Sequence, residues 1–453
     1  MNGITLPAEI PAEAPISPVP EASRNRLIDA LRGVALLGIL LMNIPGFAMP
    51  DYSSESFRND PTNVNFWVRA VINTVFEGKM RALFGMIFGA GVVLFVTRKE
   101  QSGKSVTGLF YRRMFWLILF GLIHAHVILW LGDILFLYGV CGMIVYLFRN
   151  VNPKYLILAV PIVAVLDFSA NTVIYRYVRS QRIEYVEAKK VEQAGGTLTD
   201  NQKQAIENWH GWETSFIPNR EEAAKNTQTM KSGYATVASR VRKLAIDAEF
   251  KFLLMEIWDS LALMLLGIAL FKWGFLTGEW STRAYVRTML LGYGIGMPLV
   301  VYSFYHGYLY NPNLEAMLLR MEQVPVEWVG LIYPFQRILL VMAHVSGLVL
   351  LYQAGIARRL FSCLEAVGQM AFTNYITHSV ICTLVFFGYG LNYYAEMEFY
   401  QIYFVALGIW AMQLVVSPIW LHYFRFGPLE WLWRTLTYWK WQPFLKKKAA
   451  SPD

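Results

Sequence analysis

The sequence predicts an all-α membrane protein, a polytopic transmembrane helical bundle of about 10 spans with cytoplasmic N- and C-termini and a small helical extracytoplasmic segment. Composition is the first observation behind this prediction: 55% of the 453 residues are hydrophobic, only 16% are charged, and the mean hydropathy is +0.36. Soluble domains carry about 25% charged residues, so long stretches of this chain avoid water. The second observation is that these stretches approach about 20 apolar residues, the length of a membrane-spanning helix.

Ten apolar runs are the candidate spans. The second run is short unless it extends back through the amphipathic stretch 66–80, and a tight hairpin at Leu131-Gly132-Asp133 joins the third and fourth. In chain order the runs are 31–50, 83–97, 114–131, 133–148, 155–175, 254–273, 287–305, 330–354, 366–390 and 401–422.

The distribution of Lys and Arg predicts the orientation. The connections on the side of the two termini hold 21 basic residues, whereas the short connections on the other side hold 5. Basic residues concentrate in the short cytoplasmic loops of membrane proteins, and long loops are exempt from this rule. We therefore expect both termini in the cytoplasm.

Composition outside the apolar runs divides the chain into five parts. Residues 1–23 are rich in Pro, Ala and Glu without Lys or Arg, which is typical of a disordered leader and not of a signal peptide. Residues 24–175 and 252–424 are the N- and C-terminal transmembrane bundles. Between them, the polar segment 176–251 has helix-like blocks and is expected to form an extracytoplasmic helical cap. Residues 425–453 alternate Trp, Tyr and basic residues, as a cytoplasmic interfacial tail does.

Several function classes are excluded by what the sequence lacks. Its three cysteines, Cys141, Cys363 and Cys382, have no CxxC spacing and predict neither a disulfide framework nor a zinc site. The net charge of +8 does not come with a basic stripe interleaved with aromatic residues, so nucleic acid is not an expected partner. No P-loop, HExxH, Ser-His-Asp elbow or pair of glycosidase carboxylates occurs, and no metal or permanently bound cofactor is expected.

Ionisable residues within apolar runs are the default functional candidates, because burying them in hydrocarbon is costly. In the first run, Asp29 and Arg32 are three residues apart and can pair, while Asn43 lies about 21 Å farther along the helix. Arg81, with Lys79, precedes the second run on the side where basic residues are scarce. It is a candidate for an anionic group, and snorkelling to the interface is the alternative.

Histidines are the candidate general bases. His124 and His126 lie about 200° apart around one helix, so they do not face one site. Asp133, in the hairpin that follows, can orient a histidine or cap the next helix. In the ninth run Asn374 and His378 lie on one helix face. Each of these groups also has a structural interpretation, as a buried hydrogen-bonded network.

Remaining ionisable groups inside the runs are Glu256 and Asp259 in the sixth, and Arg337 and His344 in the eighth. With Asp29 and Arg32, the two carboxylates would line the path of a transporter. That alternative lacks the sequence repeats and broken paired spans typical of transporters.

The motif Arg26-Leu-Ile-Asp29-Ala-Leu-Arg32-Gly33, followed by Asn43, resembles the YeiB-like family of bacterial membrane proteins, whose C-terminal half is a domain of unknown function. Further motifs in the same order extend the resemblance from about residue 24 to 438. They are Arg81-Ala-Leu-Phe84-Gly-Met-Ile-Phe88-Gly-Ala-Gly91, Gly121-Leu-Ile-His124, Gly132-Asp133-Ile-Leu135, Met264-Leu-Leu-Gly267, Gly368-Gln-Met-Ala-Phe-Thr373-Asn374-Tyr375 and Gly427-Pro428-Leu-Glu430-Trp431.

The first of these motifs is also similar to two membrane acyltransferase groups, the heparan alpha-glucosaminide N-acetyltransferases and the acyltransferase-3 group. The latter has its catalytic histidine where this chain has Asn43, and an amide is no general base at neutral pH. If the reaction is shared, another histidine must be the base. We expect His124, with Asp133 close in sequence as its orienter, and His378 is the competitor. Asn43 would then donate to the acyl oxyanion.

An integral-membrane acyltransferase of the bacterial inner membrane is therefore the first expectation. It would move an acetyl group from cytoplasmic acetyl-CoA to an envelope glycan or lipid, with Asp29, Arg32, Arg81 and Asn374 as binding residues. Arg98, Lys104, Arg112 and Arg113 are candidates for the CoA phosphates. A small-solute transporter and a non-catalytic membrane scaffold are the alternatives. The bilayer is the expected partner, and the sequence leaves a homodimer open.

Overall fold

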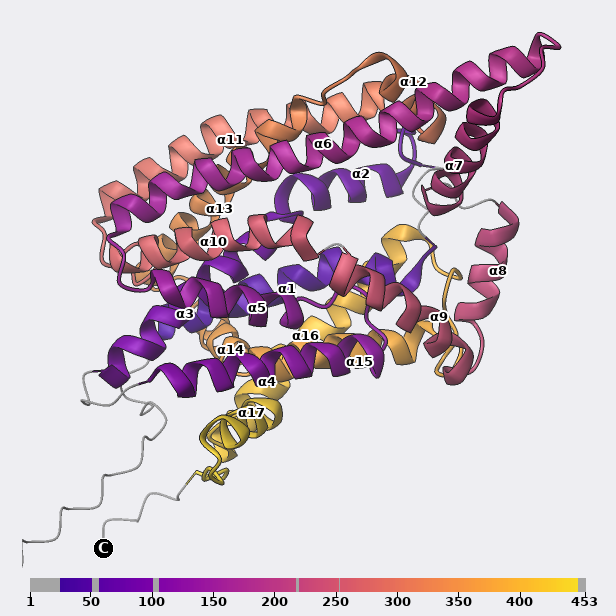
Figure 1. The fold of residues 1–453 in the computed structure, drawn as a ribbon. Coiled ribbons are helices and arrows are strands. Elements are labelled where there is room, and N and C mark those ends of the chain that lie inside the picture. The colour runs from indigo at the N-terminus through magenta and orange to yellow at the C-terminus, as the bar shows by residue number, and fades with distance from the viewer. Residues whose placement is uncertain (1–24, 51–56, 101–105, 217–219, 252, 447–453) are drawn as a thin grey trace, which may run out of the picture.

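The computed structural model describes residues 25–50, 57–100, 106–216, 220–251 and 253–446, and within these ranges the regular elements are all helical (Figure 1). The predicted leader 1–23 and Lys104 lie outside the described residues, as does the Arg98 side chain. The elements are α1 (Arg26–Ala48), α2 (Val64–Val71), η2 (Ile72–Phe76), α3 (Lys79–Glu100), α4 (Thr107–His126), α5 (Leu135–Val145), η3 (Tyr146–Phe148), α6 (Pro153–Gln193), α7 (Asp200–Phe216), α8 (Arg220–Met230), α9 (Tyr234–Ile246), η4 (Asp247–Lys251), α10 (Leu253–Lys272), α11 (Thr282–Tyr310), α12 (Leu314–Gln323), α13 (Val329–Gln353), α14 (Arg358–Gln369), α15 (Ala371–Phe386), α16 (Phe399–Tyr423) and α17 (Pro428–Tyr438).

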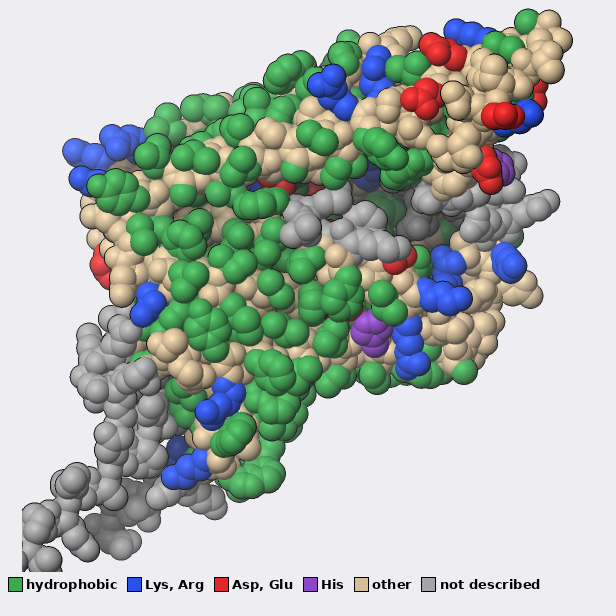
Figure 2. Space-filling view, in the orientation of Figure 1, with side chains coloured by type: hydrophobic (Ala, Val, Ile, Leu, Met, Phe, Trp, Pro, Cys, Tyr) green, Lys and Arg blue, Asp and Glu red, His purple; other side chains and the backbone are tan. Residues whose placement is uncertain are grey.

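Six of the described helical segments are long and apolar enough to cross a membrane, judged by length and composition: 26–48, 64–96, 153–193, 282–310, 329–353 and 399–423. The outward sides of α6, α11 and α16 are apolar, with exposed residues such as Leu158, Leu290 and Phe404. Figure 2 shows hydrophobic side chains over the broad middle of one face, with charged side chains gathered at its two ends. This is the pattern of a helical membrane protein. The count of ten spans and the cytoplasmic position of the termini stay predictions.

Helix α1 forms the centre of the bundle because it is apolar around most of its circumference and most of its residues are buried. It crosses α14 with the two backbones in contact. A Cβ atom on Gly368 would lie 1.8 Å from the Asp29 carbonyl oxygen, and one on Gly33 would lie 2.2 Å from that of Leu364. Only glycine allows this approach, so the Asp29-Ala-Leu-Arg-Gly33 motif fixes where α1 and α14 cross.

A second close crossing joins α3 to α10. A Cβ atom on Gly89 would lie 2.1 Å from the carbonyl oxygen of Met264, and one on Gly267 would lie 2.0 Å from that of Met86. Gly85 and Gly89 form a GxxxG pattern in α3, which is typical of close helix contact, and the structure has this contact at Gly89.

One expected span is divided in the structure, and one expected boundary lies within a helix. The run 366–390, predicted as one span, is divided between α14 and α15, with a break at Met370. The break has a physical cause, because the Glu430 side chain accepts hydrogen bonds from the N–H groups of Phe372 and Thr373 and so caps a new helix. The expected boundary at residue 175/176 falls inside α6, a single 41-residue helix that continues into the polar segment.

Candidate functional site

A cavity of about 270 Å³ opens at the end of the bundle where α1 begins and α17 lies, here called the terminal face. We call it the terminal-face cavity. It is enclosed by residues of α1, α3, α4, α5, α14, α15 and α17, including Asn25, Asp29, Arg32, Phe84, Phe88, Phe95, Arg113, Leu117, Leu135, Tyr138, Gln369, Tyr375, Glu430, Trp433 and Arg434.

Charged groups line the mouth of this cavity. The Arg32 guanidinium donates to Asp29 at 2.7 Å, so the pair expected from their spacing is present. Arg113 stacks on the Trp433 ring at 3.7 Å, and Arg434 stacks on Phe426 at 4.4 Å. In the described part of the chain, no carboxylate forms an ion pair with Arg113. The mouth therefore carries arginine charge suited to an anionic group.

Helix α17 closes one wall of the mouth. Glu430 caps the N-terminus of α15, and the Thr373 hydroxyl also donates to it at 2.5 Å. Burial raises the pKa of this carboxyl, and the hydrogen bonds from Thr373 and Phe372 oppose that rise. Arg112 donates to the Thr437 carbonyl at 3.1 Å and lies over Trp439. Arg112 thus attaches α17 to α4 and does not line the cavity, whereas its neighbour Arg113 does.

The interior of the cavity is apolar up to two tyrosines. Tyr138 packs edge-on against Phe88, and its hydroxyl donates to the Arg81 carbonyl oxygen at 3.4 Å. Tyr375 packs against the His124 ring, with centroids 5.0 Å apart. Tyr138 thus lies between the cavity and Arg81, and Tyr375 lies between the cavity and His124.

Behind Tyr375 three side chains form a continuous hydrogen-bonded chain. Asp133 Oδ1 lies 2.7 Å from His124 Nδ1, and His124 Nε2 lies 2.7 Å from Ser379 Oγ. The His124 side chain is fully buried, and the Asp133 side chain is 2% exposed. The order carboxylate, imidazole, hydroxyl is that of the groups that activate a serine in acyl transfer.

The hairpin after α4 brings Asp133 back to His124. Leu129 takes a left-handed backbone conformation, with φ of 67°, which helps the chain turn before α5. Asp133 Oδ2 accepts the Phe136 N–H at 2.8 Å, so this carboxylate both caps α5 and contacts the histidine. A Cβ atom at Gly121 would lie 2.6 Å from Asp133 Oδ2, and this glycine therefore leaves the carboxylate its place.

The other candidate histidines lie elsewhere. His378 Nε2 bonds to Gln413 Oε1 at 2.8 Å, and the Gln413 amide donates to the Asn374 carbonyl oxygen. Asn374 in turn donates to Ser417. These contacts connect α15 to α16 without a carboxylate. His126 pairs with Glu249 at 2.9 Å, away from His124 as the helix geometry requires.

The end of α1 far from the terminal face lines a second cavity of about 230 Å³, here called the opposite-face cavity. Its wall includes Gly46, and a Cβ atom there would lie 3.1 Å from the Trp130 ring. The same ring stacks on Phe47, with centroids 3.8 Å apart. Trp130 Nε1 is buried and has no hydrogen-bond acceptor among the described residues, although it approaches the Tyr375 hydroxyl. Trp130 and Tyr375 therefore lie between the two cavities.

Asn43 is half-buried on α1, one turn before Phe47. Within the described ranges no hydrogen bond joins it to His124 or Asp133. The structure does not bring it into the His124 group, and its expected role as an oxyanion donor stays a prediction.

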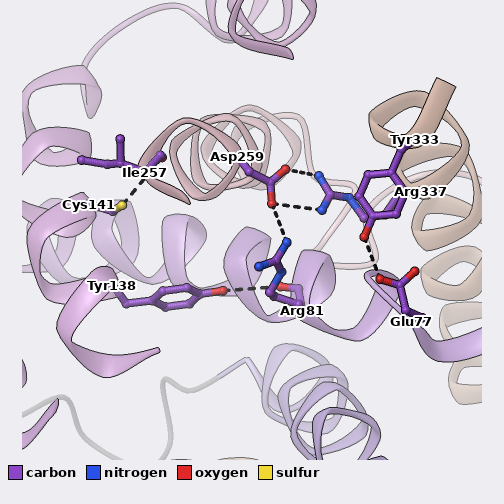
Figure 3. A network of polar contacts seen from close by, with 8 residues as sticks. All are labelled: Glu77, Arg81, Tyr138, Cys141, Ile257, Asp259, Tyr333 and Arg337. Atoms are coloured by element: carbon purple, nitrogen blue, oxygen red, sulfur yellow. Dashed lines mark hydrogen bonds and ion pairs between the residues drawn. The ribbon is translucent and has the colours of Figure 1, made fainter. Parts of the chain in front are cut away.

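Arg81 lies in a separate network (Figure 3). Its guanidinium donates to Asp259 Oδ2 at 3.0 Å, and Arg337 donates to both oxygens of the same carboxylate. Tyr333 donates to Glu77 beside them, at 3.0 Å. Lys79 is buried and donates to the Asn73 carbonyl oxygen. The carboxylates expected to line one transporter path are thus divided, since Asp259 lies here, Asp29 lies at the terminal-face cavity and Glu256 is exposed.

Sequence reasoning missed Ser379 as a member of the His124 chain. The sequence places Ser379 one helical turn after Tyr375, on the same face of the helix. It does not predict the contact with His124, which lies 255 residues away. No group of three His, Cys, Asp or Glu side chains in the described residues is arranged to hold a metal ion.

Comparisons with known proteins find relatives along almost the whole chain. Residues 270–440 match the family model "Protein of unknown function (DUF418)". The chain is 31% identical to the uncharacterized protein YxaH of Bacillus subtilis (strain 168), over 95% of this chain and 98% of that one. It is 29% identical to the uncharacterized protein YeiB of Escherichia coli (strain K12), over 91% and 96% of the two chains. No solved structure matches significantly.

Proposed function

The chain belongs to the family of YxaH and YeiB, and from this premise we propose that it is a membrane acyltransferase of the bacterial inner membrane. It takes an acyl group from a cytoplasmic thioester, acetyl-CoA in the simplest case, and transfers it to a hydroxyl or amine of an envelope glycan or lipid. The names of the relatives give no activity. The observation that carries the proposal is the Asp133–His124–Ser379 chain, buried behind the inner wall of a cavity with arginines at its mouth.

The terminal-face cavity is suited to a CoA thioester. Arg113 and Arg434 line this cavity, and guanidinium groups bind phosphate groups. The interior is lined by Phe84, Phe88 and Leu117, which suit the less polar arm that carries the acyl group.

His124 is the base in this proposal. The Phe136 N–H and the His124 Nδ1–H both donate to Asp133, which leaves His124 Nε2 with a lone pair toward the Ser379 hydroxyl. The negative charge of Asp133 also stabilises the imidazolium that forms when Nε2 takes a proton.

The transfer is written in two balanced halves. Ser379 Oγ bonds to the thioester carbonyl carbon while its proton moves to His124 Nε2. The C–S bond then breaks, and the departing thiolate takes that proton, which leaves an ester on Ser379. In the second half the acceptor O–H or N–H gives its proton to Nε2 as it attacks the ester, and Ser379 regains the proton when the C–Oγ bond breaks.

The acyl group can reach the hydrogen-bonded Asp133–His124–Ser379 side chains only after one rearrangement. His124 and Ser379 do not line the terminal-face cavity, and the Tyr375 ring stands between. In our proposal the acyl arm displaces the Tyr375 side chain. The Ile134 N–H, which donates to the Tyr375 hydroxyl at 3.4 Å, and the Trp130 N–H, which has no acceptor among the described residues, are then the donors for the carbonyl oxygen.

The test uses the purified full chain with acetyl-CoA, and measures free thiol by colour reaction and acetylated Ser379 by peptide mass spectrometry. We expect thiol release and a labelled Ser379 peptide, and we expect His124→Ala to lower thiol release by about 10²–10⁴-fold. His378→Ala is the matched control, because His378 is equally buried but contacts no carboxylate. Full release by His124→Ala would refute the proposal. Release that depends on His124 without a label on Ser379 would instead support direct transfer with His124 as base.

A carrier for a small solute is the second candidate function, because two cavities lie on opposite ends of α1 with aromatic side chains between them. Mass spectrometry of the purified protein distinguishes the two functions. A bound acyl-CoA supports the transferase, whereas a solute that proteoliposomes take up without chemical change supports the carrier.

A further inference from the structure

The opposite-face cavity carries three polar groups in an otherwise apolar wall. Its apolar lining comes from the last turns of α1, from Pro50, from Ile72 and from Phe399 of α16. The polar groups are Arg69 of α2, Asn73 of η2 and Tyr403 of α16, which come from three different elements.

Arg69 brings a positive charge to this cavity without a counter-ion. Its side chain is half-buried, and no carboxylate in the described ranges forms an ion pair or hydrogen bond with it. The charged group that interacts with it is Arg58, another cation, whose buried Nε has no acceptor in the same part of the chain. Two partly buried guanidinium groups without an anion are unfavourable, because burial of charge is costly unless it is paired.

Two acidic side chains among the described residues, Glu398 and Asp60, are already engaged. Glu398 accepts from the Asn65 amide at 2.9 Å and also caps α16. Asp60 accepts both the N–H and the hydroxyl of Thr62. Neither carboxylate therefore neutralises Arg69 in this structure.

Tyr403 supplies an independent observation. It is only 8% exposed and lines the cavity, yet its hydroxyl has no hydrogen-bond partner among the described residues. A buried polar group without a partner costs free energy, and such groups are rare in folded proteins. An acceptor within the cavity would satisfy this hydroxyl.

We propose that the opposite-face cavity binds a phosphate group, with Arg69 supplying the charge-assisted hydrogen bonds and the Tyr403 hydroxyl a further donor. The Arg69 guanidinium suits a phosphate group, because phosphate oxygens accept from guanidinium in a bidentate manner. The same phosphate chemistry is offered by a soluble phosphate ester and by a phospholipid headgroup.

The proposed phosphate binding at the opposite-face cavity does not depend on acyl transfer. One further step rests on the proposed function: the acceptor would be a phosphate-bearing molecule, held on the other side of Trp130 from the thioester. The experiment below contains no acyl donor, so its failure leaves the proposed function untouched, and failure of acyl transfer leaves this binding site untouched.

Binding is measured with the purified full chain in uncharged detergent, by the rise of the thermal unfolding midpoint on titration with inorganic phosphate and with glycerol 3-phosphate. A second arm compares nanodiscs of phosphatidylglycerol with nanodiscs of phosphatidylcholine. We expect Arg69→Gln to weaken binding by about 10–100-fold, as expected when a charge-assisted hydrogen bond is lost. Arg283→Gln removes the same charge from an exposed position outside both cavities and should leave binding unchanged.

Tyr403→Phe gives a second readout. Without ligand it should keep or raise the unfolding midpoint, because it removes a hydroxyl that has no partner, and it should weaken phosphate binding by about 2–10-fold. Stabilisation by soluble phosphate that depends on Arg69 supports a soluble ligand, and stabilisation by phosphatidylglycerol alone supports a lipid headgroup. Absence of both effects, equal binding by Arg69→Gln, or a lowered midpoint of unliganded Tyr403→Phe would overturn the proposal.

Discussion

Replacement of Asp133 by Asn separates the structural role of this side chain from its proposed chemical role. The carboxylate accepts two hydrogen bonds, one from the Phe136 N–H at 2.8 Å and one from His124 Nδ1 at 2.7 Å. An amide of the same shape has a single oxygen acceptor. Because the Phe136 N–H can only donate, the Asn oxygen should stay with it and the NH₂ group should face His124.

This arrangement reverses the donor and acceptor roles in the hydrogen bonds from residue 133 through His124 to Ser379, while the number of hydrogen bonds stays the same. His124 Nδ1 must then accept, so the ring proton moves to Nε2 and points at Ser379 Oγ. The loss in stability is the difference between a charge-assisted and a neutral hydrogen bond, about 1 kcal/mol. Asp133→Ala instead leaves two buried groups without partners, which costs about 2–4 kcal/mol.

Two measurements on the same three proteins check this reasoning. Thermal unfolding in detergent should place Asp133→Asn close to the wild type and Asp133→Ala well below both. Thiol release from acetyl-CoA should fall by about 10³–10⁴-fold in Asp133→Asn, since a histidine with its proton on Nε2 cannot accept one from Ser379.

Two outcomes would contradict it. Normal thiol release by Asp133→Asn would mean that the tautomer of His124 has no part in the reaction. An unfolding midpoint of Asp133→Asn as low as that of Asp133→Ala would mean that the negative charge itself is needed, as it is when His124 is already an imidazolium in the resting protein.

Three further predictions concern topology and packing. A reporter fused after residue 215 should read as external and one fused after residue 445 as cytoplasmic; both on one side would contradict the orientation taken from the Lys and Arg distribution. Gly368→Ala should lower the unfolding midpoint strongly, because its Cβ would lie 1.8 Å from the Asp29 carbonyl oxygen, whereas Gly294→Ala, at a position with open space around it, is the control that should not. Asp259→Ala should cost about 3–5 kcal/mol, because it leaves the buried Arg337 without a counter-ion; the double replacement Asp259→Leu with Arg337→Met should cost less, and a loss equal to the sum of the losses of Asp259→Leu and Arg337→Met alone would mean that the pair is not coupled.

The fold class and much of the local geometry follow from the amino-acid sequence. Apolar runs with few charges leave a helix in a membrane as the available structure, since each backbone polar group must bond within its own segment. The three-residue spacing of Asp29 and Arg32 was enough to predict their pair. His124 and Asp133 were also within reach of sequence reasoning, because a short hairpin separates them, although the spacing alone left Asp133 as either a helix cap or a histidine partner; in the structure it is both.

Contacts between distant segments could not be predicted from the sequence and are seen only in the folded structure. Ser379 meets His124 across 255 residues, and Arg69 and Tyr403 come to one cavity from α2 and α16. Likewise, Asp259 pairs with Arg81 and Arg337 rather than lying on one path with Asp29. Helical periodicity tells which residues share a face of one helix, but which face meets which neighbour depends on how the backbones can approach. Here that was set by the glycines at the crossings of α1 with α14 and of α3 with α10.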